Sequence, residues 1–424
     1  MKANFKHGIN HLRNRKIKGG ALYVSIIVSL VVSILLMALL LISFLNQRKL
    51  TNIGSLSQLN LNLKSGLEIA KSNYFNEAIN NKWFILDEED TDSLKINKLN
   101  WGAFNIVSVT TKNLHHQLSI SGLYGTHMSI DTGLLISNNG RPIGMAGNIV
   151  FKSNCYLPDG GIKPAFIEGL SYIANPITTA HIKKSSFQVP IPHTSFINNL
   201  KNQINSRNDY MDSIVTGLNE RFENKFDKKT ILLSYGVQQI ANCNWSGNIK
   251  IMSANEVIID SSAKLNDVLI VAKKVKFKEG FKGAVHVICT DSIVTGKNNY
   301  FAYPSSFSVF NSTNKSLGAI LLNENVMFYG SILAIAESDD CKTLIKLHNK
   351  SEVNGLVYSS HYLHLEGILN ANVYANSLLL STPSAVYENH ILSCEINPKA
   401  IADVLAVPDI FKADKALIKC KQFN

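Results

Sequence analysis

Side chains that support metal binding or nucleophilic catalysis are scattered along this chain rather than grouped. The closest two cysteines, Cys394 and Cys420, are 26 positions apart, so no Cys-x-x-Cys motif for metal or redox chemistry occurs. His115 and His116 are adjacent, and on a strand they would point to opposite faces and could not share a metal ion. No His-Glu-x-x-His, Gly-x-Ser-x-Gly or phosphate-loop motif is found. The sequence therefore assigns no catalytic residue, metal ligand or cofactor.

Two groups of carboxylates come nearest to an acid–base site. Residues 87–92 hold five carboxylates in six positions, but the run lacks the glycine that a calcium loop needs, which indicates a solvated loop. Glu337, Asp339 and Asp340 form the second group. Glycosidase chemistry needs two carboxyls roughly 5–10 Å apart across a groove. Adjacent residues of a Ser-Asp-Asp turn are typical of solvated corners, so we predict that the protein is not an enzyme.

A long apolar stretch determines how the other segments are positioned. Ala21–Leu45 contains 25 residues without a charge, a proline or a glycine. A helix needs roughly 20 apolar residues to cross a hydrocarbon core of about 30 Å, so the stretch predicts a transmembrane helix in contact with the lipid bilayer. The apolar core of a secretory signal peptide spans only about 7–15 residues, which argues against a cleaved signal peptide of that kind.

The charges on either side of this stretch predict its orientation. The first twenty residues contain six lysines and arginines and no acidic residue, and only Arg48 and Lys49 follow the stretch closely. Because basic flanks favour the cytoplasm, we expect a cytoplasmic leader, residues 1–20, and a periplasmic or extracellular remainder, anchored by a single pass in a bacterial inner membrane. The formal net charge is +11, and six of these charges belong to the leader. The small excess that is left gives no reason to expect a nucleic acid partner.

The junction between leader and apolar stretch carries a second signal. A basic segment, Gly19-Gly20 and an apolar helix beginning Ala21-Leu22 resemble the class III signal of type IV pilins and pseudopilins, particularly minor pilins. The resemblance implies cleavage by a prepilin peptidase between Gly20 and Ala21, with other pilin-like subunits as partners. The family's usual glutamate, five residues into the mature chain, is Ser25 here. An uncleaved signal anchor is the alternative.

Three segments follow the predicted membrane helix. Leu59, Leu63 and Leu67 recur at helical spacing, which predicts an amphipathic stalk helix over residues 46–80 with a break near residues 52–54. Alternating apolar and polar runs predict a small β-rich domain over residues 81–192. Residues 193–230 have a helical pattern in two pieces, which predicts a helical connector or cap.

The C-terminal half has a different texture. Residues 231–395 contain many short apolar runs, such as Val285–Ile288 and Ile332–Ile335, separated by Asn, Ser, Asp, Lys and Gly. This pattern favours stacked coils of about 20–25 residues each, as in a right-handed parallel β-helix, or solenoid. A β-sandwich is the alternative fold. Residues 396–424 are interpreted as a basic, solvated tail.

The predicted fold is therefore mainly β, with one long N-terminal transmembrane helix and a solenoid in the ectodomain. The leading functional hypothesis is a non-catalytic, membrane-anchored protein of the cell envelope that acts as a pilin-like structural or assembly component. The second hypothesis is an anchored β-helix that binds or cleaves carbohydrate, with cell-surface polysaccharide as its partner. The third is a bactofilin-like, polymer-forming scaffold.

Overall fold

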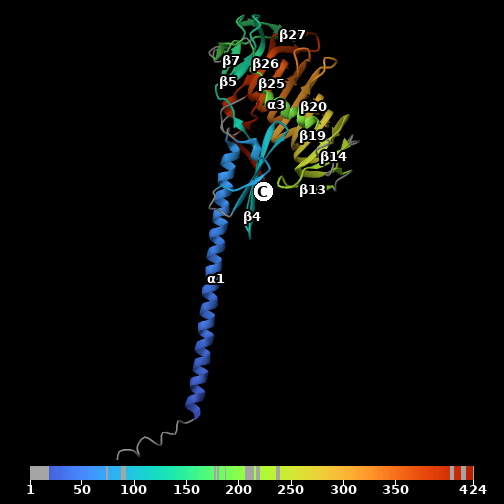
Figure 1. Ribbon diagram of the computed structural model, residues 1–424. Helices are drawn as coiled ribbons and strands as arrows, with labels where there is room; N and C mark the ends of the chain where they lie inside the picture. The colour runs from blue at the N-terminus through green and yellow to red at the C-terminus, as the bar shows by residue number, and fades with distance from the viewer. Residues whose placement is uncertain are drawn as a thin grey trace, which may run out of the picture. The chain divides into compact units, whose positions relative to one another are not determined.

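The computed structural model describes residues 19–72, 75–86, 92–175, 178, 181–186, 188–205, 214–215, 220–234, 239–401, 405–411 and 417–423. The chain divides into two compact units, residues 1–61 and residues 62–424. The first unit is helical where it is described, and the second is mainly β. Figure 1 follows these elements along the chain.

Helix α1 (Gly19–Lys71) is a single helix of 53 residues. It contains the predicted membrane helix and most of the predicted stalk, but it ends at Lys71 rather than near residue 80. Residues 52–54, where the sequence predicts a break, are helical, because no proline interrupts the segment and one glycine costs a long helix only about 1 kcal/mol. The main-chain NH of Leu417 bonds to the carbonyl oxygen of Lys71 at 3.1 Å, which satisfies one acceptor at the helix end.

An antiparallel sheet forms one part of the second unit. Strands β1 to β4 follow one another in the order of the sequence, and two C-terminal strands both pair with β4. The strands are β1 (Trp83–Phe84), β2 (Ser93–Trp101), β3 (Phe104–Lys112), β4 (Gln117–His127), β29 (Ala406–Val407) and β30 (Ile418–Phe423).

The last turns of α1 pack on this sheet. Leu63 and Ala70 of the helix share a buried cluster with Leu94 and Val109 of the sheet. Gly66 makes the approach close, since a Cβ atom there would lie 2.8 Å from the side chain of Leu94. The glycine lowers helix propensity, and its place in the helix is explained by this contact.

The C-terminal segment is not the solvated tail that the sequence predicts for residues 396–424. Strands β29 and β30 complete the antiparallel sheet on β4. Leu405, Val407, Ile410 and Leu417 are buried. The lysines of the segment suggested a solvated tail, but its apolar residues are spaced so that they reach the core.

The larger sheet of the second unit is parallel. Its described strands number 22, and all pair in parallel except β27, which pairs antiparallel with β26. They close around one large apolar core. The strands are β5 (Thr132–Ile136), β6 (Ile143–Phe151), β7 (Asn154–Leu157), β8 (Ile162–Pro164), β11 (Ile182–Lys184), β12 (Ile214–Val215), β13 (Arg221–Asn224), β14 (Ile231–Ser234), β15 (Gln239–Ile240), β16 (Asn244–Gly247), β17 (Ile249–Met252), β18 (Glu256–Ile259), β19 (Lys264–Phe277), β20 (Lys282–Val294), β21 (Tyr300–Asn311), β22 (Gly318–Leu322), β23 (Met327–Ala336), β24 (Thr343–Leu347), β25 (Glu352–His364), β26 (Gly367–Ser381), β27 (Val386–Glu388) and β28 (His390–Ile396).

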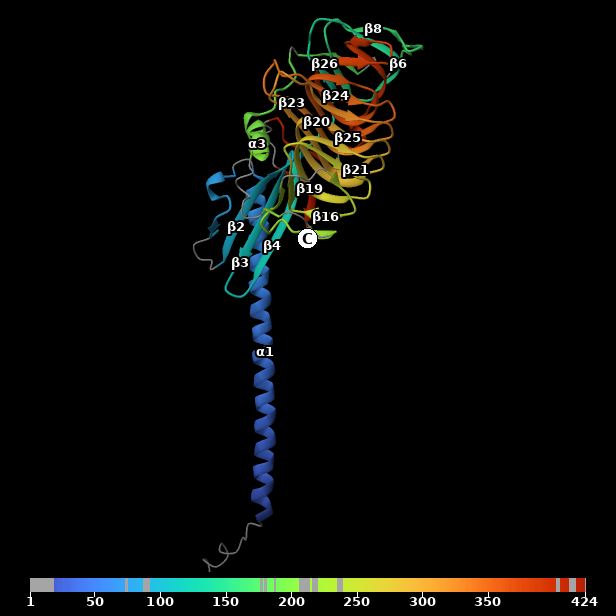
Figure 2. The same cartoon turned by 90° about the vertical axis from the view of Figure 1, so that its right-hand side faces the viewer.

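One inward-facing column of residues shows how the parallel strands stack. Each member lies opposite the next in strand register, at steps between 16 residues (Val357 to Val373) and 25 residues (Phe307 to Ile332). Figure 2 shows these strands one above another from β16 to β26. All members of the column are buried, and they are Leu233, Ile251, Ile270, Val287, Phe307, Ile332, Val357 and Val373.

The column continues into an earlier part of the chain. Val373 lies opposite Leu134 of β5, and Leu134 lies opposite Cys155 of β7. The predicted domain of residues 81–192 is therefore divided: β1 to β4 belong to the antiparallel sheet, and β5 to β8 extend the parallel sheet beyond β26. Sequence order could not indicate this, because strand pairing depends on matching apolar faces and not on position along the chain.

The predicted helical connector over residues 193–230 is helical only in part. Helix α3 (Thr194–Asn205) is its first piece, and Phe196 and Leu200 of this helix are buried against the outer side of the parallel sheet. The second predicted piece lies in part outside the described residues, and its described residues contain strands β12 and β13. Its spacing of apolar residues fits either structure over so short a run, and pairing with β14 and β16 decides for strands.

A buried polar junction joins the two sheets. The indole NH of Trp101 donates to the carbonyl oxygen of Asp267 at 2.7 Å. The side-chain amide of Gln203 accepts from the NH of Gly102 at 2.9 Å and donates to its carbonyl oxygen at 3.0 Å. Gly102 has a φ of 62°, and a Cβ atom there would lie 2.5 Å from the hydroxyl of Ser306, so only glycine fits this turn.

His286 lies fully buried at the same junction. Its Nδ1 atom is 2.9 Å from the hydroxyl of Ser306, which also accepts from the NH of Ala103. The ring nitrogen and the serine hydroxyl share one hydrogen bond, whose direction depends on the tautomer of the imidazole. Burial lowers the pKa of His286 to about 3, and the positive charge of Lys421 adds to this effect. Lys421 itself binds the carboxylate of Asp267 at 2.7 and 2.9 Å.

The buried histidine predicts a loss of stability in mild acid. Because the folded pKa lies below the unfolded value of about 6.5, the unfolded chain takes up the proton first, and stability falls as the pH drops from about 6.5 toward 3. Between pH 7.5 and 5.5 we expect the wild-type free energy of unfolding to fall by about 1.4 kcal/mol more than that of His286→Asn. Equilibrium urea unfolding of the detergent-solubilised chain at both pH values measures the difference. An equal fall in both proteins would contradict the assignment.

Candidate functional site

The two residues of the predicted cleavage position lie at the start of α1. Gly20 and Ala21 are both helical and exposed. The predicted leader lies outside the described residues except for its last two positions. The position that carries a glutamate in typical pilins is Ser25, whose hydroxyl donates to the carbonyl oxygen of Leu22 at 3.0 Å.

Two further serines in the apolar helix have the same arrangement. Ser29 donates to the carbonyl oxygen of Ile26 at 2.9 Å, and Ser33 donates to that of Ser29 at 2.7 Å. Each hydroxyl is satisfied by its own helix. A polar group without a partner would cost several kcal/mol in hydrocarbon, so these bonds make the serines compatible with lipid.

The first carboxylate group lies mostly outside the described residues, which exclude residues 87–91. Its last member, Asp92, is buried and accepts a hydrogen bond from the amide of Asn62 at 3.3 Å. This carboxylate holds the end of α1 to the antiparallel sheet.

Two members of the second carboxylate group border a groove of the second unit. The groove has a volume of about 460 Å³ and lies between the loop before α3 and strands β23, β25 and β26. Glu337 and Asp339 line it, whereas Asp340 does not. The carboxylate of Glu337 forms an ion pair with Lys201 at 2.6 Å. Glu337 is thus held in an ion pair with a lysine of α3.

His361 is the only histidine among the residues that line the groove. Its Nδ1 atom lies 3.5 Å from the hydroxyl of Thr343. Burial lowers the pKa of His361, and the charge of Lys342 acts in the same direction, against a smaller opposing effect of Asp339. The lowered pKa favours the neutral imidazole of His361 at neutral pH.

The cysteines and the adjacent histidines carry no visible chemistry. All six cysteines are free thiols, and all but Cys420 are buried. Burial raises the pKa of Cys155 and Cys289 well above the ordinary value, which keeps them protonated and unreactive. Within the described parts of the chain, no group of three or more His, Cys, Asp or Glu side chains could hold a metal ion.

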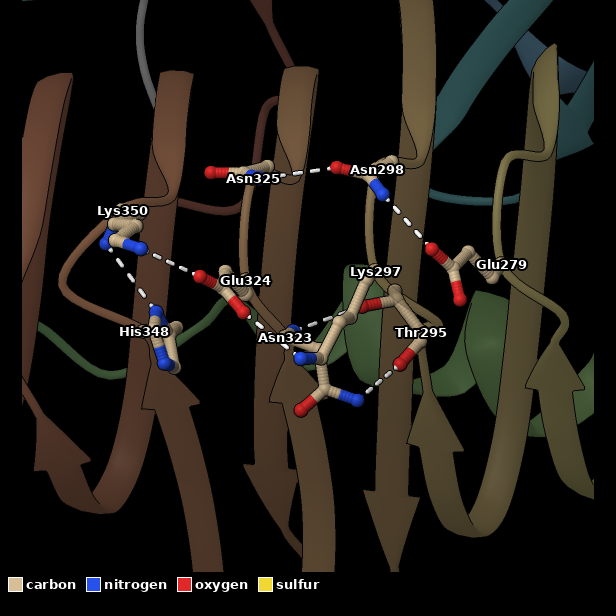
Figure 3. Close-up of polar contacts among 9 residues, drawn as sticks. All are labelled: Glu279, Thr295, Lys297, Asn298, Asn323, Glu324, Asn325, His348 and Lys350. Atoms are coloured by element: carbon tan, nitrogen blue, oxygen red, sulfur yellow. Dashed lines mark hydrogen bonds and ion pairs between the residues drawn. The ribbon is translucent and has the colours of Figure 1, made fainter.

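A ladder of polar side chains runs along one corner of the parallel sheet (Figure 3). The amide of Asn325 donates to the side-chain oxygen of Asn298 at 3.0 Å, and Asn298 donates to the carboxylate of Glu279 at 2.9 Å. The two asparagines have φ values of 56° and 57°, a backbone conformation that asparagine tolerates better than most residues. Successive corners are thereby held in the same shape.

A line of charges follows the amide ladder (Figure 3). Glu324 binds Lys297 at 2.9 Å and Lys350 at 2.6 Å, so one carboxylate links three successive corners. These hydrogen bonds, that of Lys350 first, lower the pKa of Glu324 to about 2. The corner ladder, defined as Glu279, Lys297, Asn298, Glu324, Asn325 and Lys350, is an organising element of the sheet.

Sequence reasoning missed the corner ladder. The available signal was the recurrence of an asparagine just before a strand, at Asn298 before Tyr300 and at Asn325 before Met327. A comparison of aligned coils would have revealed it, but the coils differ in length and the alignment requires the strand register.

The corner ladder predicts a specific response to substitution. Asn325→Ala should lower the free energy of unfolding by about 1 kcal/mol, because alanine disfavours a positive φ and cannot donate to Asn298. Asn325→Gly keeps the backbone conformation and should cost less than Asn325→Ala. Thermal and urea unfolding of both variants test this. A larger loss in the glycine variant would show that backbone conformation is not the controlling factor.

The chain was compared with known proteins by sequence and by structure. Protein-family models, curated protein sequences and solved structures give no match to this chain. The function is therefore inferred from the chain's own residues and their geometry.

Proposed function

We propose that the protein is a non-catalytic, membrane-anchored component of the bacterial cell envelope that resembles the minor type IV pilins in its N-terminal architecture. The observation that carries the proposal is the continuity of α1 from its apolar start to Lys71, where its last turns pack on an antiparallel sheet. Pilins have this order of elements: a basic leader, a long helix that begins apolar, and a sheet on the end of that helix.

Membrane anchoring has the most direct support. Among the described residues, one helix is long and apolar enough to cross a membrane. Leu22, Met37 and Leu40 have exposed fractions of 66%, 74% and 71%. Contact between water and so many large apolar side chains along one helix would be unfavourable, so the exposed surface of this helix is suited to lipid. The six basic residues before the helix favour a cytoplasmic N-terminus and the inner membrane, with the second unit outside the cytoplasm.

Assembly with other pilin-like subunits is the role that follows from cleavage. A helix freed of its basic leader can leave the bilayer only where neighbouring subunits bury it again. Gly20 and Ala21 are exposed at the helix start, as a peptidase substrate requires. Without cleavage the same helix remains a permanent anchor.

The parallel sheet is proposed to form a right-handed solenoid. Steps of 16 to 25 residues between stacked positions support coils, and connections between parallel strands are right-handed in almost all proteins. A stack of this kind gives a rigid body with long side faces, which suits recognition and scaffolding outside the cell membrane.

Processing at Gly20 provides the test of the pilin-like role. Protein isolated from native membranes should begin at Ala21, and Gly20→Leu should keep Met1 and the whole leader, because prepilin peptidases require a small residue before the cut. Gly54→Leu is the matched control, since its Cβ atom would meet no atom within 4 Å.

Intact mass and N-terminal sequencing read out this experiment. A wild-type chain that keeps Met1 in the membrane would contradict the pilin-like role and leave a plain signal anchor. A chain found in the soluble fraction would contradict anchoring itself.

A further inference from the structure

The parallel sheet carries an exposed row of large side chains beside the corner ladder. Tyr300, Met327 and Ile368 have exposed fractions of 40%, 38% and 45%, unusual for such residues on a sheet face. They occupy one line in strand register: Lys282 lies opposite Tyr300, Tyr300 opposite Met327, and Met327 opposite Glu352, which lies opposite Ile368.

A second row lies two residues further along the same strands. Tyr329 is opposite Asn354, and Asn354 is opposite Asn370. The rings of Tyr300 and Tyr329 lie with centroids 5.8 Å apart. The two rows together are called the tyrosine strip, and its members are Lys282, Tyr300, Met327, Tyr329, Glu352, Asn354, Ile368 and Asn370.

The polar members of the tyrosine strip hold one another in place. Glu352 accepts hydrogen bonds from the amides of Asn354 at 3.0 Å and Asn370 at 3.3 Å. Asn370 also donates to the side-chain oxygen of Asn354 at 2.9 Å. Asn354 is buried and holds the other two in place. The carboxylate of Glu352 and the amide of Asn370 are half-buried, and beside the exposed aromatic rings they form a surface that can bond to hydroxyls and stack on flat apolar faces.

One end of the tyrosine strip is positively charged. Lys282 and, on the preceding strand, Lys264 are exposed, and neither has a carboxylate partner within the described part of the chain. Lysines at the neighbouring corners are paired, such as Lys297 and Lys350 with Glu324. The unpaired lysines therefore leave this end complementary to an anion.

We propose that the tyrosine strip binds an acidic polysaccharide laid across the parallel strands. The rings of Tyr300 and Tyr329 stack on sugar faces, the Glu352 group bonds to hydroxyls, and the lysines meet carboxylates of the sugar chain. Neighbouring strands lie about 4.7–4.9 Å apart, so successive side chains of one row are separated by about the length of one sugar ring. This role goes beyond anchoring and does not depend on cleavage or assembly.

Other macromolecules fit this surface less well. An added peptide strand needs free main-chain groups at a sheet edge, whereas the main chains of β21, β23 and β25 are paired on both sides. Single-stranded nucleic acid also stacks on aromatic rings, but proteins that bind it hold its phosphates along a positively charged groove, and the tyrosine strip is positive at one end only.

Affinity electrophoresis of the detergent-solubilised full chain in gels with polygalacturonate tests the proposal. The wild type should be retarded by polygalacturonate and much less by neutral dextran. Tyr300→Ala should weaken binding about tenfold, while Tyr300→Phe keeps the ring and should bind like the wild type. Lys282→Gln should weaken binding and reduce its salt dependence. Lys276→Gln is the matched control, since Lys276 is exposed on β19 outside the strip.

Several results would overturn the proposal. No retardation of the wild type by polygalacturonate, or unchanged binding of Tyr300→Ala, would each do so. Equal losses in Lys282→Gln and Lys276→Gln would show attraction by net charge alone. Tighter binding of a single-stranded oligonucleotide would assign the strip to nucleic acid instead. Because Tyr300 is exposed, unchanged melting of its two variants confirms that any loss reflects the surface and not the fold.

Discussion

The second unit depends on one interaction: the inward-facing apolar side chains of each parallel strand are buried by those of the strands above and below it. Val287, Phe307 and Ile332 are buried because their neighbours in the column cover them, and a single strand separated from the stack would expose such a residue to water. Each buried side chain of this size contributes about 1.5–3 kcal/mol. The outer features follow from this stack, because the corner ladder and the tyrosine strip both repeat at the intervals that the inner column sets.

The antiparallel sheet links this stack to the end of α1. Trp101, Gly102 and Gln203 hold the sheet to the stack with hydrogen bonds between buried groups, so neither partner can shift without leaving a polar atom unsatisfied. On its other side the sheet receives Leu63 and Ala70 of the helix. A sheet that is covered on both faces needs strands with apolar or buried residues at successive positions, because successive side chains point to opposite faces. Strand β3 has this pattern of burial.

The sequence allowed the local elements to be predicted better than their partners. The apolar run at Ala21–Leu45 and the short runs after residue 231 have periodicities that only one type of element satisfies, and both predictions agree with the described structure at the level of a long apolar helix and a mainly β unit. The pairing of Leu134 with Val373 was beyond reach, because no local pattern records a contact over such a distance. The corner ladder and the tyrosine strip were missed for the same reason: each becomes a surface only when the register aligns residues such as Tyr300 and Met327.

The position of β5 beside β26 has a consequence for how the chain is made. Leu134 leaves the ribosome long before Val373, yet it pairs with β26 at the far end of the stack. Strands β5 and β6 therefore lack their partners β26 and β28 until the last part of the parallel sheet has been synthesised. Folding cannot proceed step by step from the N-terminus, and the rate of closure should be slow for a chain of this size because its contacts are so distant. Until that pairing forms, the open edges of these strands can pair with other chains, so the incomplete stack is the state most exposed to aggregation.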